Sequence, residues 1–170
     1  MRVAILTISD SVSRGEREDR SGQAIAEHCQ ELGWEVASRV VLPDEENQIA
    51  GRLAELADSG SLDLILTVGG TGLGPRDVTP EATMRVAERL VPGLGERMRA
   101  ADASTNPRAI LSRSQGACRG RTLMLNLPGS PRGAVESFSV VAEVLPHAIE
   151  ILRGGGHGPA PGHGAGGGKP

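Results

Sequence analysis

Apolar runs and amphipathic segments alternate along the first half of the chain. "RVAILTI" at residues 2–8 and "LDLILTV" at 62–68 are continuous apolar runs, typical of strands buried on both faces of a parallel sheet. The alternating pattern of residues 34–42 predicts another strand. Segments with apolar residues at helical intervals follow these strands, at residues 21–33, 44–60 and 80–90. This βαβαβα order predicts a doubly wound α/β sheet with right-handed crossovers.

The second half has a less regular pattern. Residues 93–103 predict a short helix, and residues 109–121 predict irregular structure or one arm of a hairpin. "TLMLNL" at 122–127 predicts a strand, and a long amphipathic helical pattern follows from 131 to 153. Pro146 lies inside that pattern, so we expect the last helix to kink or divide there.

The segment from residue 154 to residue 170 is rich in Gly, His and Pro and has no apolar periodicity. Such a chain cannot offset its ordering entropy, so we expect a disordered tail after a single folded domain at residues 1–153. His157 and His163 are possible ligands for a transition metal. Because two histidines on a flexible chain make a poor site, a passive tail is the favoured interpretation.

Composition excludes several classes of function. The formal net charge is -3, and the chain has one Phe, one Trp and no Tyr, so it lacks the basic surface and stacking residues of a nucleic-acid binder. Two cysteines without CxxC spacing, and an N-terminal apolar run too short to span a membrane, predict a cytoplasmic protein with no membrane partner. Lysine occurs only as Lys169, which excludes a Walker A or Schiff-base lysine in the predicted domain.

Four polar loops follow predicted strands and carry unusual sequences. They are residues 9–22, 43–47, 69–80 and 126–133. The loops after parallel strands open on one edge of the sheet, which is where folds of this kind bind ligands. The four loops together therefore predict a binding site at that edge.

The third loop, "GGTGLGPRDVTP", combines several features that bind phosphate. It contains four glycines, Gly69, Gly70, Gly72 and Gly74, which allow positive φ. The N–H groups from Gly70 to Gly72 can therefore form an anion nest. Thr79 is a predicted N-cap with Pro80 in the first helical position, which places a helix dipole beside the loop. Arg76 is predicted to add a bidentate fork for phosphate.

Two aspartates at the same edge suggest a divalent cation. Asp77 lies beside the predicted phosphate nest, where a carboxylate is repulsive unless a cation such as Mg²⁺ lies between them. Asp44 follows the preceding strand, and one or two carboxylates plus substrate phosphates commonly hold Mg²⁺. Two alternatives stay open: Asp77 as an Asx-turn residue, and Asp44 as the cap of the helix that begins near Glu45.

The fourth loop, "NLPGSPRG", predicts a second anion pocket. Asn126 ends a strand, Gly129 permits a close backbone approach, and Ser130 is a predicted N-cap with Pro131 after it. Pro128 completes the predicted substrate-binding set of this loop. Two pockets suit a substrate with two separated phosphates, or a nucleotide plus a phosphorylated partner. The alternative is a capped helix that binds nothing.

The motifs "DSVSRGEREDRSG", "LPDEEN", "GGTGLGPRDVTPEAT", "AILSRSQG" and "NLPGSPRG" resemble those of the MogA/MoaB family of molybdenum cofactor biosynthesis proteins, over residues 2–153. The resemblance implies a three-layer α/β fold around a mostly parallel sheet. It also implies a Mg²⁺-dependent nucleotidyltransferase, a molybdopterin adenylyltransferase that transfers AMP from ATP to the terminal phosphate of molybdopterin and releases pyrophosphate. A homotrimer or hexamer is implied, as is contact with the molybdate-insertion protein of the pathway.

The same resemblance implies roles for particular residues. Asp44 and Asp77 match the family's essential acidic residues, and Thr71, Ser112 and Asn126 match positions tied to binding or turnover of the pterin. Family members that lack the acidic residue of the glycine loop are inactive, so the motifs "RDVTPEA" and "PDE" favour an active enzyme here. The alternatives are a catalytically silent molybdopterin-binding or scaffold protein, and a generic nucleotide- or sugar-phosphate-binding α/β enzyme.

Overall fold

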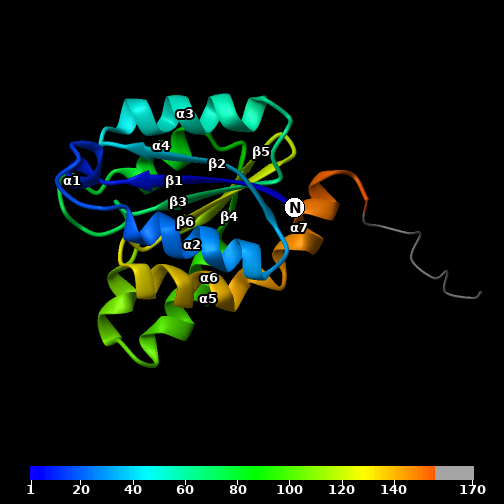
Figure 1. Ribbon diagram of the computed structural model, residues 1–170. Coiled ribbons are helices and arrows are strands. Elements are labelled where there is room, and N and C mark those ends of the chain that lie inside the picture. Colours follow the sequence, from blue (N-terminus) through cyan, green and yellow to red (C-terminus); the bar gives the residue numbers. More distant parts are fainter. Residues whose placement is uncertain (156–170) are drawn as a thin grey trace, which may run out of the picture.

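The computed structural model describes residues 1–155. The disordered tail expected after residue 153, and metal binding by His157 and His163, fall outside the described residues except at positions 154 and 155. Within residues 1–155, six strands form one sheet in the order β2-β1-β3-β6-β5-β4, with helices on both faces (Figure 1). The expected three-layer α/β fold with a mostly parallel sheet is confirmed.

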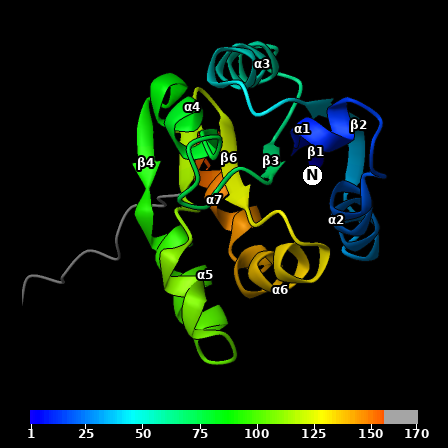
Figure 2. The same ribbon diagram turned by 90° about the vertical axis from the view of Figure 1, so that its left-hand side faces the viewer.

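Four of the six strands are parallel, and the predicted binding loops follow them. These strands are β2 (Glu35–Leu42), β1 (Arg2–Ile8), β3 (Leu64–Val68) and β6 (Thr122–Leu127). The register pairs Thr7 of β1 with Val68 of β3, and Val68 with Leu127 of β6. The central strands therefore end level with one another, and the loops that follow them meet at one edge, which Figure 2 views face on.

An antiparallel edge completes the sheet. The short strand β5 (Gly116–Arg119) forms a hairpin with β6 and pairs on its other side with β4 (Arg89–Val91). Both expectations for residues 109–121 are met in part: residues 116–121 form one arm and the turn of a hairpin, and residues 112–115 are irregular. The helix predicted to run to residue 90 is too long, because α4 (Thr79–Val86) ends before β4 begins. Val91 precedes a proline, which disfavours helical backbone there, and the chain pairs with β5 instead.

Helices pack on both faces of the sheet (Figures 1 and 2). One face carries α2 (Arg20–Glu31), α5 (Pro92–Ala103), α6 (Pro131–Ala142) and α7 (Leu145–Leu152), and the other carries α3 (Glu46–Asp58) and α4. Ile5 and Leu66 face the first layer, and Leu6 and Ile65 face the second, all fully buried. Burial on both faces explains why the central strands read as unbroken apolar runs.

The two predicted helix starts have different outcomes. Ser130 caps α6 as expected and accepts a hydrogen bond from the Gly133 N–H at 3.2 Å. Thr79 is not the cap of α4, and that prediction is wrong. Val78 precedes the helix, and the Thr79 hydroxyl donates instead to the Gly69 carbonyl at 2.8 Å. This bond ties the glycine loop to the first turn of α4.

Pro146 divides the last amphipathic segment, as expected. Helix α6 ends at Ala142, and Pro146 lies in the first turn of α7, where the missing N–H is not needed. Two short elements lie in predicted loops: α1 (Asp10–Ser13) and the 3₁₀ helix η1 (Pro107–Leu111). Within residues 1–155, none of the helices combines the length and the apolar composition needed to cross a lipid bilayer.

Candidate functional site

A cavity of about 730 Å³ lies at the carboxyl edge of the sheet. Its floor is formed by the ends of β1 and β3, from Thr7 to Ser9 and from Val68 to Gly70. The chain leaves β1 for β2 on one side and later adds β3 on the other, so the strand order reverses between β1 and β3. Ligands of doubly wound sheets bind in the crevice at such a reversal.

Close backbone contacts hold three loops together at this floor. Gly69 has φ of 110°, and a Cβ there would lie 2.3 Å from the Ile8 carbonyl oxygen. A Cβ at Gly129 would lie 3.3 Å from the Gly69 Cα, so the third and fourth loops also touch. Glycine is required where main chains approach this closely. The cavity floor is therefore built mainly of backbone.

The glycine loop presents unused N–H groups. Gly70 has φ of 63°, and a Cβ there would lie 2.4 Å from the Thr79 hydroxyl and 3.1 Å from Asp44 Oδ1. The N–H groups of residues 70–73 meet no acceptor within residues 1–155, whereas Gly74 donates to Asp77 Oδ2 at 2.8 Å. These free donors agree with an anion nest, which stays a prediction.

Asp44 lies in the cavity wall and pairs with the first loop. The Asp10 N–H donates to Asp44 Oδ2 at 2.8 Å, and the Asp44 N–H donates to Asp10 Oδ1 at 3.1 Å. The carboxylate does not cap α3, whose N-cap is Glu45 without a side-chain bond, so that alternative is wrong. Burial raises the pKa of Asp44, and the neighbouring charges of Asp10 and Asp77 raise it further, against the Asp10 N–H and Arg76, which lower it.

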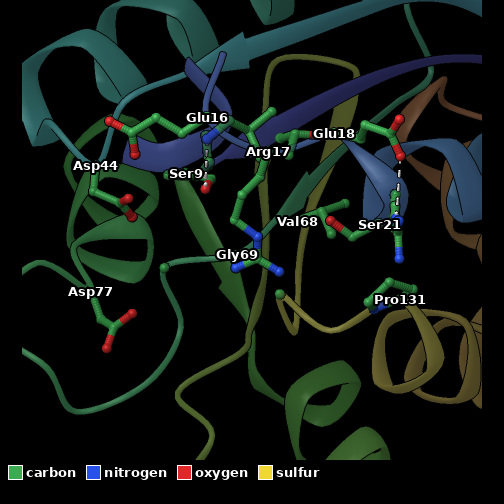
Figure 3. Close-up of a pocket in the computed structure, with 16 residues that line it drawn as sticks. Ser9, Glu16, Arg17, Glu18, Ser21, Asp44, Val68, Gly69, Asp77 and Pro131 are labelled. Atoms are coloured by element: carbon green, nitrogen blue, oxygen red, sulfur yellow. Dashed lines mark hydrogen bonds and ion pairs between the residues drawn. The ribbon is translucent and has the colours of Figure 1, made fainter. Parts of the chain in front are cut away.

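Asp77 lines the same cavity from the glycine loop. Its Oδ2 accepts the Gly74 N–H and would lie 2.8 Å from a Cβ at either Gly72 or Gly74. The carboxylate therefore closes the loop backward onto Gly74 rather than forming an Asx turn toward Thr79. Asp44 and Asp77 lie on the same side of the cavity (Figure 3). In the part of the chain that the structure describes, no group of three or more His, Cys, Asp or Glu side chains is arranged to hold a metal ion.

Arg76 does not reach the cavity. Its guanidinium pairs with both carboxylate oxygens of Asp10, at 3.0 and 3.2 Å, and with Glu45 Oε1 at 2.8 Å. Arg76 lowers the pKa of Asp10, while Asp10 and Glu45 raise the pKa of Arg76. The residue clamps the first three loops together. The predicted phosphate fork stays a prediction, and it requires these ion pairs to open.

The structure brings five of the predicted residues to the cavity wall and leaves seven outside it. Those in the wall are Gly69, Gly70, Gly129, Asp44 and Asp77; those outside are Thr71, Gly72, Arg76, Ser112, Asn126, Pro128 and Ser130. Asn126 is fully buried in β6, where its amide donates to the hydroxyls of Thr67 and Thr83 at 2.9 Å each. Ser112 follows η1 and donates to Ser114 at 3.0 Å. The roles implied for these residues stay predictions.

Sequence reasoning missed two groups of residues. Arg113 donates to the Gly72 carbonyl at 2.7 Å and also bonds to the Asp77 carbonyl and to Glu81. It braces the glycine loop from 36 and 41 residues away in sequence, so no local signal indicates this role. The first loop contributes charged side chains to the cavity: Glu16, Arg17, Glu18 and Arg20. The dense charge pattern of "RGEREDR" is the signal that could have found them.

Comparisons with known proteins identify the family of this chain. Residues 4–147 match the family model described as a probable molybdopterin binding domain. The molybdopterin adenylyltransferase of Escherichia coli K12 is 38% identical over 169 residues, covering 91% of this chain and 86% of that protein. That of Helicobacter pylori J99 is 36% identical over 156 residues, covering 91% and 89%.

Solved structures give the same result. The molybdopterin biosynthesis enzyme MoaB from Thermus thermophilus has a TM-score of 0.85 at 52% identity, covering 90% of this chain and 96% of that one. The molybdopterin biosynthesis Mog protein from Mycobacterium ulcerans has a TM-score of 0.82 at 35% identity, covering 89% and 98%. With its glycine loop, its paired carboxylates and these similarities, the chain belongs to the molybdopterin-binding domain family of molybdenum cofactor biosynthesis proteins.

Proposed function

We propose that this protein is a molybdopterin adenylyltransferase that transfers AMP from ATP to the terminal phosphate of molybdopterin and releases pyrophosphate. One observation carries the proposal: a cavity at the strand-order reversal is lined by Gly70, whose N–H has no acceptor within residues 1–155, and by the carboxylates of Asp44 and Asp77. The relatives named for this activity are 36–38% identical over most of the chain, which supports the assignment.

The chemistry needs positioning and charge neutralisation more than proton transfer. The attacking phosphate oxygen is already anionic, so a strong general base is not required. In the proposed mechanism one phosphate binds at the Gly70 N–H, which lies in the cavity, beside the free N–H groups of residues 71–73 further along the loop. A second phosphate, from either ATP or molybdopterin, binds at the N-terminus of α6, where Gly129 and Pro131 line the cavity. Asp44 and Asp77 face the phosphates from one side.

The donor set fits Mg²⁺. Two carboxylates line the cavity, and burial together with the like charges of Asp10 and Asp77 raises the pKa of Asp44, an arrangement that a cation relieves. Asp44 and Asp77 would hold the ion, and bound Mg²⁺ supplies neutralisation of phosphate charge. The remaining ligands of such an ion are commonly substrate phosphates and water.

The reaction itself tests the proposal. Purified protein incubated with ATP, Mg²⁺ and molybdopterin should release pyrophosphate and form adenylylated molybdopterin. In Asp77→Asn the amide oxygen still accepts the Gly74 N–H, so the variant should fold normally while pyrophosphate release falls at least about 100-fold. Asp58→Asn is the matched control, because Asp58 pairs with Arg119 on the surface away from the cavity. Near-normal turnover by Asp77→Asn would refute the proposed role.

Two alternatives predict different results in the same assay. A catalytically silent molybdopterin-binding or scaffold protein binds molybdopterin without releasing pyrophosphate. A generic nucleotide- or sugar-phosphate-binding enzyme shows no binding of molybdopterin at micromolar concentration. Calorimetric titration with molybdopterin, run beside the pyrophosphate assay, separates all three.

Two further parts of the proposal rest on the family resemblance: a homo-oligomer of three or six chains, and contact with the molybdate-insertion protein that consumes adenylylated molybdopterin. A cytoplasmic location is also expected, from the cysteine pattern and the short N-terminal apolar run. Light scattering on the purified protein measures the number of chains directly. A monomer at micromolar concentration would contradict the oligomer.

A further inference from the structure

We propose that Arg17 contacts the phosphate undergoing transfer and stabilises the charge that develops on it. The inference rests on the adenylyl transfer proposed above. It adds a catalytic residue from the first loop that lies outside both the glycine motif and the pair of aspartates. Three features support it: the charges in the cavity, the direction of the Arg17 side chain and the anchoring of its loop.

Arg17 is the uncommitted cation of the cavity. Arg20 lies 3.4 Å from Glu18, and Glu16 is paired with Arg14, which does not line the cavity. Arg76 and Arg113 are held by carboxylates and carbonyls behind the wall, as described above. Arg17 has neither an ion-pair nor a hydrogen-bond partner within residues 1–155, although it lines a cavity that also contains Asp44 and Asp77. Its guanidinium is therefore available to an anionic ligand.

The side chain of Arg17 points into the cavity. In Figure 3 it extends from the first loop toward Gly69, with Asp44 and Asp77 on one side and Pro131 on the other. Arg17 therefore shares the cavity with Gly70 of the glycine loop and with Pro131 at the N-terminus of α6, the two places proposed above to hold phosphates. A guanidinium in the same cavity as both phosphate positions can donate to the oxygens of the phosphoryl group that is transferred between them.

The loop that carries Arg17 is anchored at both ends. On one side the Glu16 N–H donates to the Ser11 carbonyl at 2.9 Å. On the other, Asp19 caps α2 through the Gly22 N–H at 2.8 Å and pairs with Arg39 of β2 at 3.0 Å. Anchoring reduces the conformational entropy lost when the side chain engages a ligand. Arg17 is consequently presented to the cavity before any substrate arrives.

A guanidinium suits the transfer step. An oxygen of the molybdopterin phosphate forms a bond to the α-phosphorus of ATP, and the bond from that phosphorus to the oxygen bridging the α- and β-phosphates breaks. The bonding electron pair leaves with pyrophosphate, and no proton has to move. Negative charge in this step lies on the phosphoryl and leaving oxygens. The planar fork of Arg17 can donate to two of them at once.

Steady-state kinetics of Arg17 variants test the proposal. Arg17→Ala should lower kcat about 100-fold, with a smaller change in KM for ATP, because the contact strengthens as charge develops. Arg17→Lys should recover about tenfold of that loss, since it keeps the charge without the fork. Arg121→Ala, a change at an exposed arginine of the β5–β6 turn that does not line the cavity, should stay within about threefold of wild type.

A binding measurement separates this proposal from the function on which it rests. Calorimetric titration of the full chain with inorganic pyrophosphate, without Mg²⁺, should give a Kd about tenfold weaker in Arg17→Ala than in wild type or Arg121→Ala. If wild type releases no pyrophosphate from ATP, the proposed function fails whatever Arg17 does. If wild type is active and folded Arg17→Ala loses less than about tenfold in kcat, the role of Arg17 is refuted. The exposed Arg17 side chain makes a folding defect unexpected, and matched melting temperatures check this.

Discussion

The fold favours the neutral form of Asp44, whereas the proposed function needs its ionised form. Its carboxylate is partly buried, accepts one N–H from Asp10 and lies in the field of Asp10 and Asp77. The sequence places Asp44 at the correct edge of the sheet, because it follows a strand. Its pairing with Asp10, and the diversion of Arg76 to Asp10, could not be predicted. They join residues 34 and 66 positions apart through loop geometry that no local pattern encodes.

The raised pKa of Asp44 gives a stability prediction. The folded pKa lies above the ordinary value of 3.8, so folding favours the protonated acid and ionisation destabilises the native state. At pH 7 in EDTA, Asp44→Asn should therefore melt at a higher temperature than wild type. The difference should shrink as the pH falls through the raised pKa of Asp44, because the wild-type side chain is then neutral like that of the variant. Differential scanning calorimetry across this range measures it.

Asp58 provides a control of opposite sign for the same experiment. The Arg119 guanidinium lowers the pKa of Asp58, so its ionised form contributes stability above about pH 4 that is lost in acid. Asp58→Asn should leave the melting temperature at pH 7 equal to that of wild type or slightly lower, because the pair is exposed. A lower melting temperature for Asp44→Asn than for wild type would contradict the electrostatic argument.

At the scale of elements, the long buried strands and amphipathic helices follow from the sequence, and the short elements do not. Strands β1 and β3 have apolar runs that only a doubly covered sheet accommodates. Strand β4 has three residues with no buried side chain and exists because it pairs with β5. The start of α4 also departs from the prediction, since Thr79 bonds to a loop carbonyl made available by tertiary contact.

The link between the glycine loop and the 112–115 segment is testable through Arg113. Arg113→Ala removes bonds to two loop carbonyls and leaves Glu81 without its partner, so the free energy of unfolding should fall by about 2 kcal/mol. Hydrogen exchange should speed up most at the hydrogen-bonded N–H groups of the glycine loop, those of Gly74, Asp77 and Thr79. Urea unfolding and exchange mass spectrometry measure the two effects.

Arg121→Ala is the matched control for this change, because Arg121 is exposed at the β5–β6 turn. It should leave both the unfolding free energy and the exchange pattern close to those of wild type. Uniform exchange changes across the whole sheet in Arg113→Ala, with none concentrated in the glycine loop, would count against a local brace.

At the scale of the molecule, one apolar layer, the one that α2, α5, α6 and α7 form with the sheet, encloses both cysteines. Cys29 on α2 and Cys118 on β5 are buried and free of disulfides. Burial raises the pKa of Cys29 to about 12. The thiolate fraction at pH 8 is then on the order of one in ten thousand, in addition to the steric barrier. The cysteine pattern of the sequence excludes a disulfide framework but cannot place either thiol in a particular layer.

Thiol labelling follows directly from this burial. With a disulfide-exchange reagent at pH 8, the native protein should give no fast-reacting thiol, and both should react at once in guanidinium chloride. The native rate should follow global unfolding, so stabilising ligands should slow it. A thiol that reacts within seconds under native conditions would show that one layer opens locally.

The backbone construction of the cavity floor limits how its selectivity can be altered. Gly69, Gly70 and Gly129 meet other main-chain or buried groups, so a larger side chain at these positions disturbs the sheet edge before it reaches a ligand. The first loop contributes through exposed side chains on a separately anchored segment. Attempts to engineer acceptance of another nucleotide or phosphorylated acceptor should therefore begin with Glu16 and Glu18, and leave Arg17 and the glycines unchanged.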